Sequence, residues 1–139
     1  MTKRHRSSRP VGERGLIMPK THQAICTVYH RGQEVGSRVI WAVGFWSRLR
    51  GLLGRLHLAA GEGCFLLPAS SVHMMGMLFP IDVVFLDKEN RVIKMAPHLS
   101  PWFGLAWARG ARAVLELPVG TIQKYGIELG ERLEVKGPI

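Results

Sequence analysis

Short runs of alternating apolar and polar residues, separated by glycine, proline and polar turns, make up most of the chain. Runs of this kind predict β-strands. The first two, AICTVYH (24–30) and SRVIWAV (37–43), flank RGQEVG, in which Gly32 and Gly36 supply turn chemistry, so they predict a hairpin. Six further short runs predict strands: CFLL (64–67), SSVHMM (70–75), IDVVFLD (81–87), RVIKMAP (91–97), AVLELP (113–118) and ERLEV (131–135). Of these, IDVVFLD is apolar on both faces, as expected of a buried strand.

About eight short strands with one or two short helices indicate a mainly β fold, a small antiparallel β-sandwich or barrel. A length of 139 residues suits one domain with a single core. We therefore expect residues 21–139 to form a single β-rich domain.

Two segments have helical spacing instead. Between Phe45 and Leu58 the leucines at 49, 52, 53 and 56 line one face of a helix, and Ser47 can cap its start. The stretch VGTIQKYG (119–126) predicts one or two helical turns that end at Gly126.

The net charge of +9 is unevenly placed, because residues 1–20 carry +5 and residues 21–139 only +4. Residues 1–20 have no hydrophobic periodicity, so burial could not offset the entropy cost of ordering them, and we expect a disordered basic tail. A basic tail attracts nucleic acid without sequence preference and in a salt-sensitive way. Nucleic acid is therefore expected only as a weak partner of the tail, and less so if translation begins at Met18.

No apolar segment approaches the ~20 residues of a membrane helix. The basic opening is not followed by the apolar core of a secretory signal, so a soluble, cytoplasmic protein without membrane association is expected. Cys26 and Cys64 lie far apart without a CxxC motif, and in a cytoplasmic chain both should be reduced thiols.

The stretch from Cys64 to Asp87 is the longest apolar run and contains the candidate site. If residues 70–87 fold as a hairpin about Leu78, His73 and Met74 lie opposite Asp82 and Val83.

Asp82 is the most informative polar residue, because strand alternation places it on the apolar face of Val84 and Leu86. A carboxylate there needs a partner. It could act as a general base or as a ligand for metal or substrate, with His73 nearby. It could instead bind backbone N–H groups or one of Arg48 and Arg50, and this structural role is favoured.

Metal and cofactor signals are weak. The set Cys64, His73, Met74, Met75 and Met77 would suit Cu(I), but methionine in an apolar run is more often core filler, and no pair of zinc ligands stands at short spacing. Phosphate-binding loops, dinucleotide-binding motifs and nucleophile elbows are missing from the sequence. We expect neither a metal nor a cofactor.

The stretch HLSPWFGLAWARG (98–110) predicts a long loop rich in aromatic residues. Trp102, Phe103 and Trp107 could form an exposed binding loop or cover one end of the sheet, and covering is favoured.

A series of segments resembles the prokaryotic domain of unknown function 192 family over about residues 24–136. The segments are RLRGLLGR (48–55), GCFLLP (63–68), VHMMGMLFPIDVVFLD (72–87), RVI (91–93), VLELPVG (114–120) and GIELGERL (126–133). The family pattern of an aromatic residue or His, then Met, Pro, an aliphatic residue and Asp falls on five positions: His73, Met74, Pro80, Ile81 and Asp82.

The resemblance implies a jelly-roll-like β fold and no established activity. Many members carry Trp-Met-Lys-Asn where this chain has residues 73–76 as His-Met-Met-Gly, so a role of that Lys and Asn cannot be transferred. Many members are also exported, and the expected cytoplasmic location departs from that.

Three functions are compatible with the sequence. The leading one is a non-enzymatic binding module for a small ligand or a protein partner, with a site at the loop from His73 to Asp82. Met74, Arg48 or Arg50, and Trp102 would line that site. The second is an enzyme that uses His73 and Asp82 for acid–base chemistry on a small anionic substrate, and the third is nucleic-acid association through the tail. The sequence does not indicate an oligomeric state.

Overall fold

The computed structural model describes residues 24–43, 52 and 55–137. Within these ranges the chain is mainly β, with one short helix. The elements in chain order are β1 (Ile25–His30), β2 (Gln33–Val43), β3 (Glu62–Leu67), β4 (Ser71–His73), β5 (Ile81–Leu86), β6 (Val92–Leu99), β7 (Leu105–Trp107), β8 (Ala113–Pro118), α2 (Thr121–Tyr125) and β9 (Glu134–Lys136).

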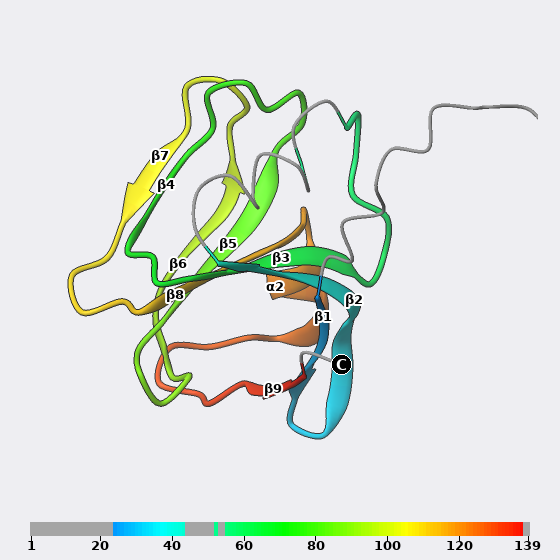
Figure 1. Ribbon diagram of the computed structural model, residues 1–139, viewed down its shortest axis with the longest axis vertical. Helices are drawn as coiled ribbons and strands as arrows, with labels where there is room; N and C mark the ends of the chain where they lie inside the picture. Colours follow the sequence, from blue (N-terminus) through cyan, green and yellow to red (C-terminus); the bar gives the residue numbers. More distant parts are fainter. Residues whose placement is uncertain (1–23, 44–51, 53–54, 138–139) are drawn as a thin grey trace, which may run out of the picture.

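Seven strands form one sheet in the order β6-β5-β8-β3-β2-β1-β9, and β4 and β7 form a separate sheet. The large sheet curls like half a barrel. In Figure 1, β3 crosses the middle of the view and β9 runs below it. The predicted strands and the mainly β class are confirmed.

The predicted hairpin of β1 and β2 is confirmed, with a tighter turn than expected. Arg31 and Gly32 both have positive φ, 51° and 75°, which is typical of the two-residue turns whose twist matches that of paired strands. β2 therefore already begins at Gln33, and Gly36 lies within the strand opposite Val28.

One pair of the large sheet is parallel, which the expectation of an antiparallel fold missed. β2 and β3 pair in the same direction, from Arg38 beside Glu62 to Val43 beside Leu67. Parallel neighbours require a crossover of about a dozen residues or more, and the connection from residue 44 to residue 61 provides one.

The hairpin expected about Leu78 does not form. β4 pairs with β7, whereas β5 pairs with β6 and β8. The segment after β4 turns back at once, because the N–H of Met77 donates to the carbonyl oxygen of Met74 at 3.0 Å. Strands β4 and β5 consequently belong to different sheets.

The two ends of the large sheet are joined by the chain that precedes β9. Arg91 and Arg132 form an isolated antiparallel bridge, and the N–H of Val92 donates to the carbonyl oxygen of Glu131 at 2.8 Å. Beside it, Glu131 accepts hydrogen bonds from the His30 ring at 3.0 Å and from Arg31 Nε at 2.8 Å. The turn of the first hairpin is thus held against the chain that leads to the last strand.

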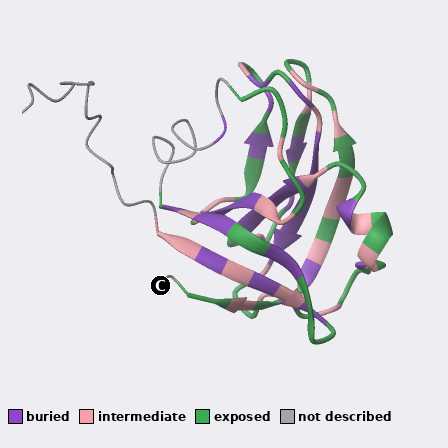
Figure 2. Ribbon diagram, turned by 90° about the vertical axis from the view of Figure 1, so that its right-hand side faces the viewer, coloured by how far each residue is buried: buried purple, intermediate pink, exposed green. Residues whose placement is uncertain are grey.

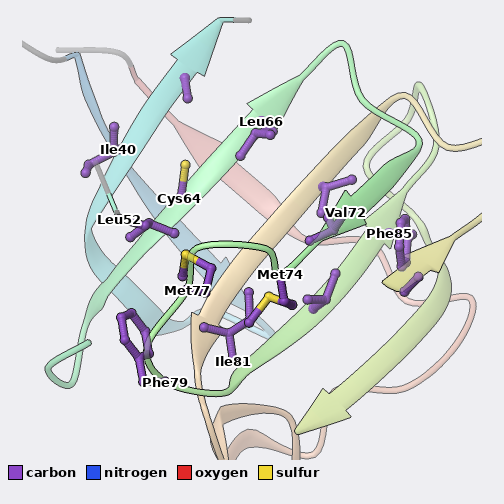
Figure 3. Close-up of a cluster of buried hydrophobic side chains, with 14 of the residues drawn as sticks. Ile40, Leu52, Cys64, Leu66, Val72, Met74, Met77, Phe79, Ile81 and Phe85 are labelled. Atoms are coloured by element: carbon purple, nitrogen blue, oxygen red, sulfur yellow. The ribbon is translucent and has the colours of Figure 1, made fainter. Parts of the chain in front are cut away.

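Buried side chains form two clusters, one on each face of the large sheet, and Figure 2 shows them along its strands. The first cluster lies between the large sheet and the small one (Figure 3). The second fills the inside of the curl. Successive residues of β5 alternate between them, with Ile81 and Val83 in the first cluster and Val84 in the second.

The predicted helix at 119–126 is confirmed as α2, which ends at Gly126 with φ 65°, the left-handed conformation common after helix ends. The helix expected over 45–58 lies mostly outside the described residues, as does the tail of residues 1–20. In the described ranges, no helix has the length and apolar character needed to cross a membrane.

Candidate functional site

Asp82 lies in β5 with 2% of its surface exposed, and backbone N–H groups surround its carboxylate. Its Oδ1 accepts a hydrogen bond from the N–H of His98 at 2.9 Å. Its Oδ2 accepts from the N–H groups of Gly120 at 3.1 Å and Ile122 at 3.0 Å. Gly120 occupies the N-cap position before α2 and has no side chain to cap the helix, so Asp82 caps it from a neighbouring strand. This geometry supports the structural role that the sequence favoured.

The structure does not bring His73 and Asp82 together. His73 is exposed on β4 of the small sheet, opposite Leu105. Asp82 points away from the first cluster, because its neighbours Ile81 and Val83 face that cluster. The acid–base pair of the enzymatic hypothesis therefore has no geometric support.

Met74 and Trp102 do lie together. The carbonyl oxygen of Met74 accepts a hydrogen bond from the N–H of Trp102 at 2.9 Å. The N–H of Met74 donates to the carbonyl oxygen of Gly104, also at 2.9 Å. The Met74 side chain is fully buried beside Met77 and Ile81 in the first cluster (Figure 3). Met74 thus anchors the loop of residues 100–104, while Trp102 stays 53% exposed. Arg48 and Arg50, the other two expected site residues, lie outside the described residues.

The small sheet carries an exposed apolar surface that we call the aromatic face. It comprises His73, Met75, Trp102, Phe103, Leu105 and Trp107. Cross-strand pairing puts Trp107 opposite Ser71 and Leu105 opposite His73 on the outer side of the sheet. The hydrogen bonds of Met74 bring the loop of residues 100–104 next to the chain that follows β4, as the upper part of Figure 1 shows.

The expectation that the aromatic residues cover the sheet was wrong. Phe103 is 93% exposed and Trp107 61%. The inner side of the small sheet is covered instead by Val72, Ala106 and Ala108, which belong to the first cluster. These short side chains let the small sheet pack closely while the aromatic rings point outward.

The surroundings of the aromatic face are basic. Lys94 Nζ lies 2.6 Å from the carbonyl oxygen of Trp107 and 5.4 Å from the centre of its ring, a cation–π contact. Arg109 follows two residues later and is exposed. The sequence has no Asp or Glu from Asn90 to Leu115. The face therefore combines aromatic surface with positive charge.

The side chains considered for Cu(I) do not gather. Cys64, Met74 and Met77 are buried in the first cluster, whereas His73 and Met75 are exposed. Among the described residues, no group of three or more His, Cys, Asp or Glu side chains could hold a metal ion. The buried methionines act as core filler, the role the sequence favoured for them.

Cys26 and Cys64 are buried, reduced thiols. Burial raises the pKa of Cys26 from 9.0 to about 11, which keeps the unreactive protonated form. We expect a disulfide reagent to modify both thiols at least about a hundredfold more slowly in the native chain than in guanidinium. Equal rates in the two solvents would contradict this burial.

The raised pKa of Cys26 also predicts a pH dependence of stability. The unfolded thiol ionises first as the pH rises, so its contribution is complete below pH 9 and is lost between about 9 and 11. Between pH 9 and pH 11 the free energy of unfolding should therefore fall less in a Cys26→Ala variant than in the unchanged chain, by an amount of the order of 2 kcal/mol. Urea titrations at both pH values test this, and identical losses would exclude it.

The fold and the sequence together identify the family. The profile of the family described as DUF192, uncharacterised ACR, matches residues 26–135. The chain belongs to the DUF192 family. It is similar to a UPF0127 protein of Thermococcus sibiricus, 32% identical over 109 residues that cover 75% of this chain and 70% of the relative. A UPF0127 protein of Pyrococcus furiosus is 33% identical over 109 residues, 75% of this chain and 91% of the relative.

Two solved structures share the fold. A protein of unknown function from Novosphingobium aromaticivorans has a TM-score of 0.71 and 27% identity, over 84% of this chain and 89% of the other. A putative transcription regulator from Sinorhizobium meliloti has a TM-score of 0.69 over 81% and 93%, and its 22% identity shows the fold alone. The DUF192 description and the names of the UPF0127 relatives specify no activity.

Proposed function

We propose that this DUF192 chain is a non-enzymatic binding module and that the aromatic face receives an acidic polypeptide segment with an apolar anchor. The observation that carries the proposal is the outward display of large apolar side chains, with Phe103 at 93% exposure. Clustered exposed apolar surface on a folded domain is typical of interaction sites. Two further expected site residues, Met74 and Asp82, are buried and bonded to backbone groups, which favours a structural role for both.

The composition of the face suits a protein partner. Interface cores are enriched in aromatic residues, Met and Arg, and the strongest single contributions come from Trp, Tyr and Arg. Burial of one large side chain such as Phe103 contributes about 1.5–3 kcal/mol. Two or three such anchors contribute about 3–9 kcal/mol before the cost of association, which is less than micromolar binding requires, so the charged groups beside the face must contribute the rest.

The charge of the face selects the partner. Lys94 lies at Trp107, Arg109 follows Trp107 by two residues in the chain, and the acid-free stretch from Asn90 to Leu115 provides no compensating carboxylate. Such a surface accelerates encounter with an acidic segment and repels basic ones. It also disfavours pairing of the face with a second copy, because that would bring like charges together.

A displayed library of random peptides tests the proposal. The full chain should select peptides with Trp, Phe or Leu next to two or more acidic residues. Phe103→Ser should weaken the selected peptides about tenfold or more. Leu129→Ser serves as the matched control, since Leu129 is 63% exposed outside the face, and should leave affinity unchanged.

Three results would overturn the proposal. Selected peptides could bind Phe103→Ser as tightly as the unchanged chain, or they could lack acidic residues. The third is a failure to select peptides while the chain binds vesicles containing phosphatidylserine, which would assign the face to a lipid surface instead.

A further inference from the structure

We propose that a second, separate site at the mouth of the curled sheet binds a small aromatic anion, such as an aryl or indolyl carboxylate. A pocket of about 280 Å³ opens there. Its apolar walls are Trp41, Phe65, Leu67 and Val135, and Lys88 and Arg112 lie at its rim. This pocket adjoins the second cluster, on the face of the large sheet opposite the small sheet and its aromatic face. The proposal is therefore independent of the function proposed above.

The floor of the pocket is a pair of aromatic rings. Trp41 of β2 and Phe65 of β3 are partners in the parallel pair, so both side chains project from the same face. Their ring centroids lie 5.1 Å apart at 30°. Phe65 is buried, whereas Trp41 is only half-buried and lines the pocket, which leaves indole surface for a flat ligand to stack upon.

The rim of the pocket favours an anion. In the part of the chain that the structure describes, neither Lys88 nor Arg112 forms an ion pair within 4 Å. Asp87 also lines the pocket, but its Oδ1 already accepts the N–H groups of Glu89 at 2.8 Å and Arg91 at 3.0 Å. Those bonds turn Oδ1 toward its own loop, and the Asp87 carboxylate also attracts Lys88, so Arg112 is the cation most available to a ligand carboxylate.

The position of Arg112 is fixed by its backbone. Its N–H donates to the carbonyl oxygen of Leu86, and its own carbonyl oxygen accepts from the N–H of Ala69, both at 2.8 Å. The guanidinium therefore projects from a rigid point between β5 and the chain that follows β3. A donor group on a rigid support loses less entropy when a ligand binds.

The size of the pocket limits the ligand. Sites for drug-sized molecules have volumes of about 300–1,000 Å³, so about 280 Å³ suits a molecule of one or two rings. Apolar walls with a few convergent polar groups are the usual composition of such sites. An aromatic ring on the Trp41 and Phe65 floor, with its carboxylate at Arg112 and Lys88, satisfies both parts of the pocket.

Amide NMR titrations of the full chain with indole-3-acetate and its uncharged analogue indole-3-acetamide test this proposal. Both should shift the indole N–H signal of Trp41 saturably, with the carboxylate bound about tenfold more tightly. Arg112→Gln should remove most of the difference between the carboxylate and the amide, since only Lys88 then remains, and should leave the amide affinity unchanged. Arg38→Gln is the matched control and should change neither affinity, because Arg38 is exposed and does not line the pocket.

Three outcomes would overturn the proposal. One is a failure of the Trp41 signal to saturate with either compound up to about 10 mM. Another is equal affinity for the carboxylate and the amide in the unchanged chain. The third is saturable shifts at Trp102 and Trp107 instead, which would move this ligand to the aromatic face.

Discussion

Replacing Asp82 by asparagine is expected to lower the free energy of unfolding by about 2–4 kcal/mol, because hydrogen bonds to a buried charged group are among the stronger ones. The carboxylate receives N–H groups from His98, Gly120 and Ile122. An asparagine of the same shape keeps one acceptor oxygen and turns an NH₂ group toward a backbone donor. At least one buried N–H then loses its partner, and the start of α2 loses its cap.

Asp87→Asn is the control for this change. Asp87 also accepts two backbone N–H groups, from Glu89 and Arg91, but it does so in an exposed turn where water can replace the bonds. Asp87→Asn should change the free energy of unfolding, measured by urea titration, by no more than about 0.5 kcal/mol. If Asp82→Asn and Asp87→Asn destabilise the chain equally, the buried carboxylate of Asp82 does not stabilise the fold more than an exposed one.

The second large effect is expected at Met74. Met74→Ala should lower the free energy of unfolding by about 2–5 kcal/mol, because it empties a fully buried position in the first cluster. The adjacent Met75→Ala should change it by less than about 0.5 kcal/mol, because Met75 is 66% exposed. Chemical denaturation of the two variants compares the same substitution at neighbouring residues in opposite environments.

The two methionine variants also separate the core from the aromatic face. Met75→Ala should weaken binding of the peptides selected on the face without loss of stability. Met74→Ala should loosen the loop of residues 100–104, whose Trp102 and Gly104 backbones bond to Met74. A Met74→Ala variant as stable as the unchanged chain would contradict the packing seen in Figure 3.

The strands were predictable because each has a local signature. The alternation in residues 24–43 located β1 and β2, and Gly126 marked the end of α2. Pairing was less predictable, since the direction of β3 depends on a crossover that leaves no period in the sequence. β7 has only three residues and lies in a stretch rich in Gly and Trp, so no local pattern predicts a strand there or its pairing with β4.

The candidate site shows the same division. The sequence located Asp82 as a carboxylate in need of a partner, but its donors lie 16 to 40 residues away. Only the tertiary fold brings them to it. The outward direction of Leu105 and Trp107 follows from the alanines at 106 and 108, which occupy the inner positions. The pocket floor depends on the parallel register of Trp41 and Phe65, which the antiparallel expectation excluded.

The pairing of the first described strand with the last bears on how this protein is made. One edge of β1 pairs with β9, which ends at Lys136, and β3 pairs with β2 on one side and with β8 on the other. During synthesis the early strands therefore leave the ribosome before their neighbours exist, with apolar faces and strand edges uncovered. Folding of the whole sheet must wait for nearly the last residues of the domain, and until then the growing chain depends on its surroundings to stay unaggregated.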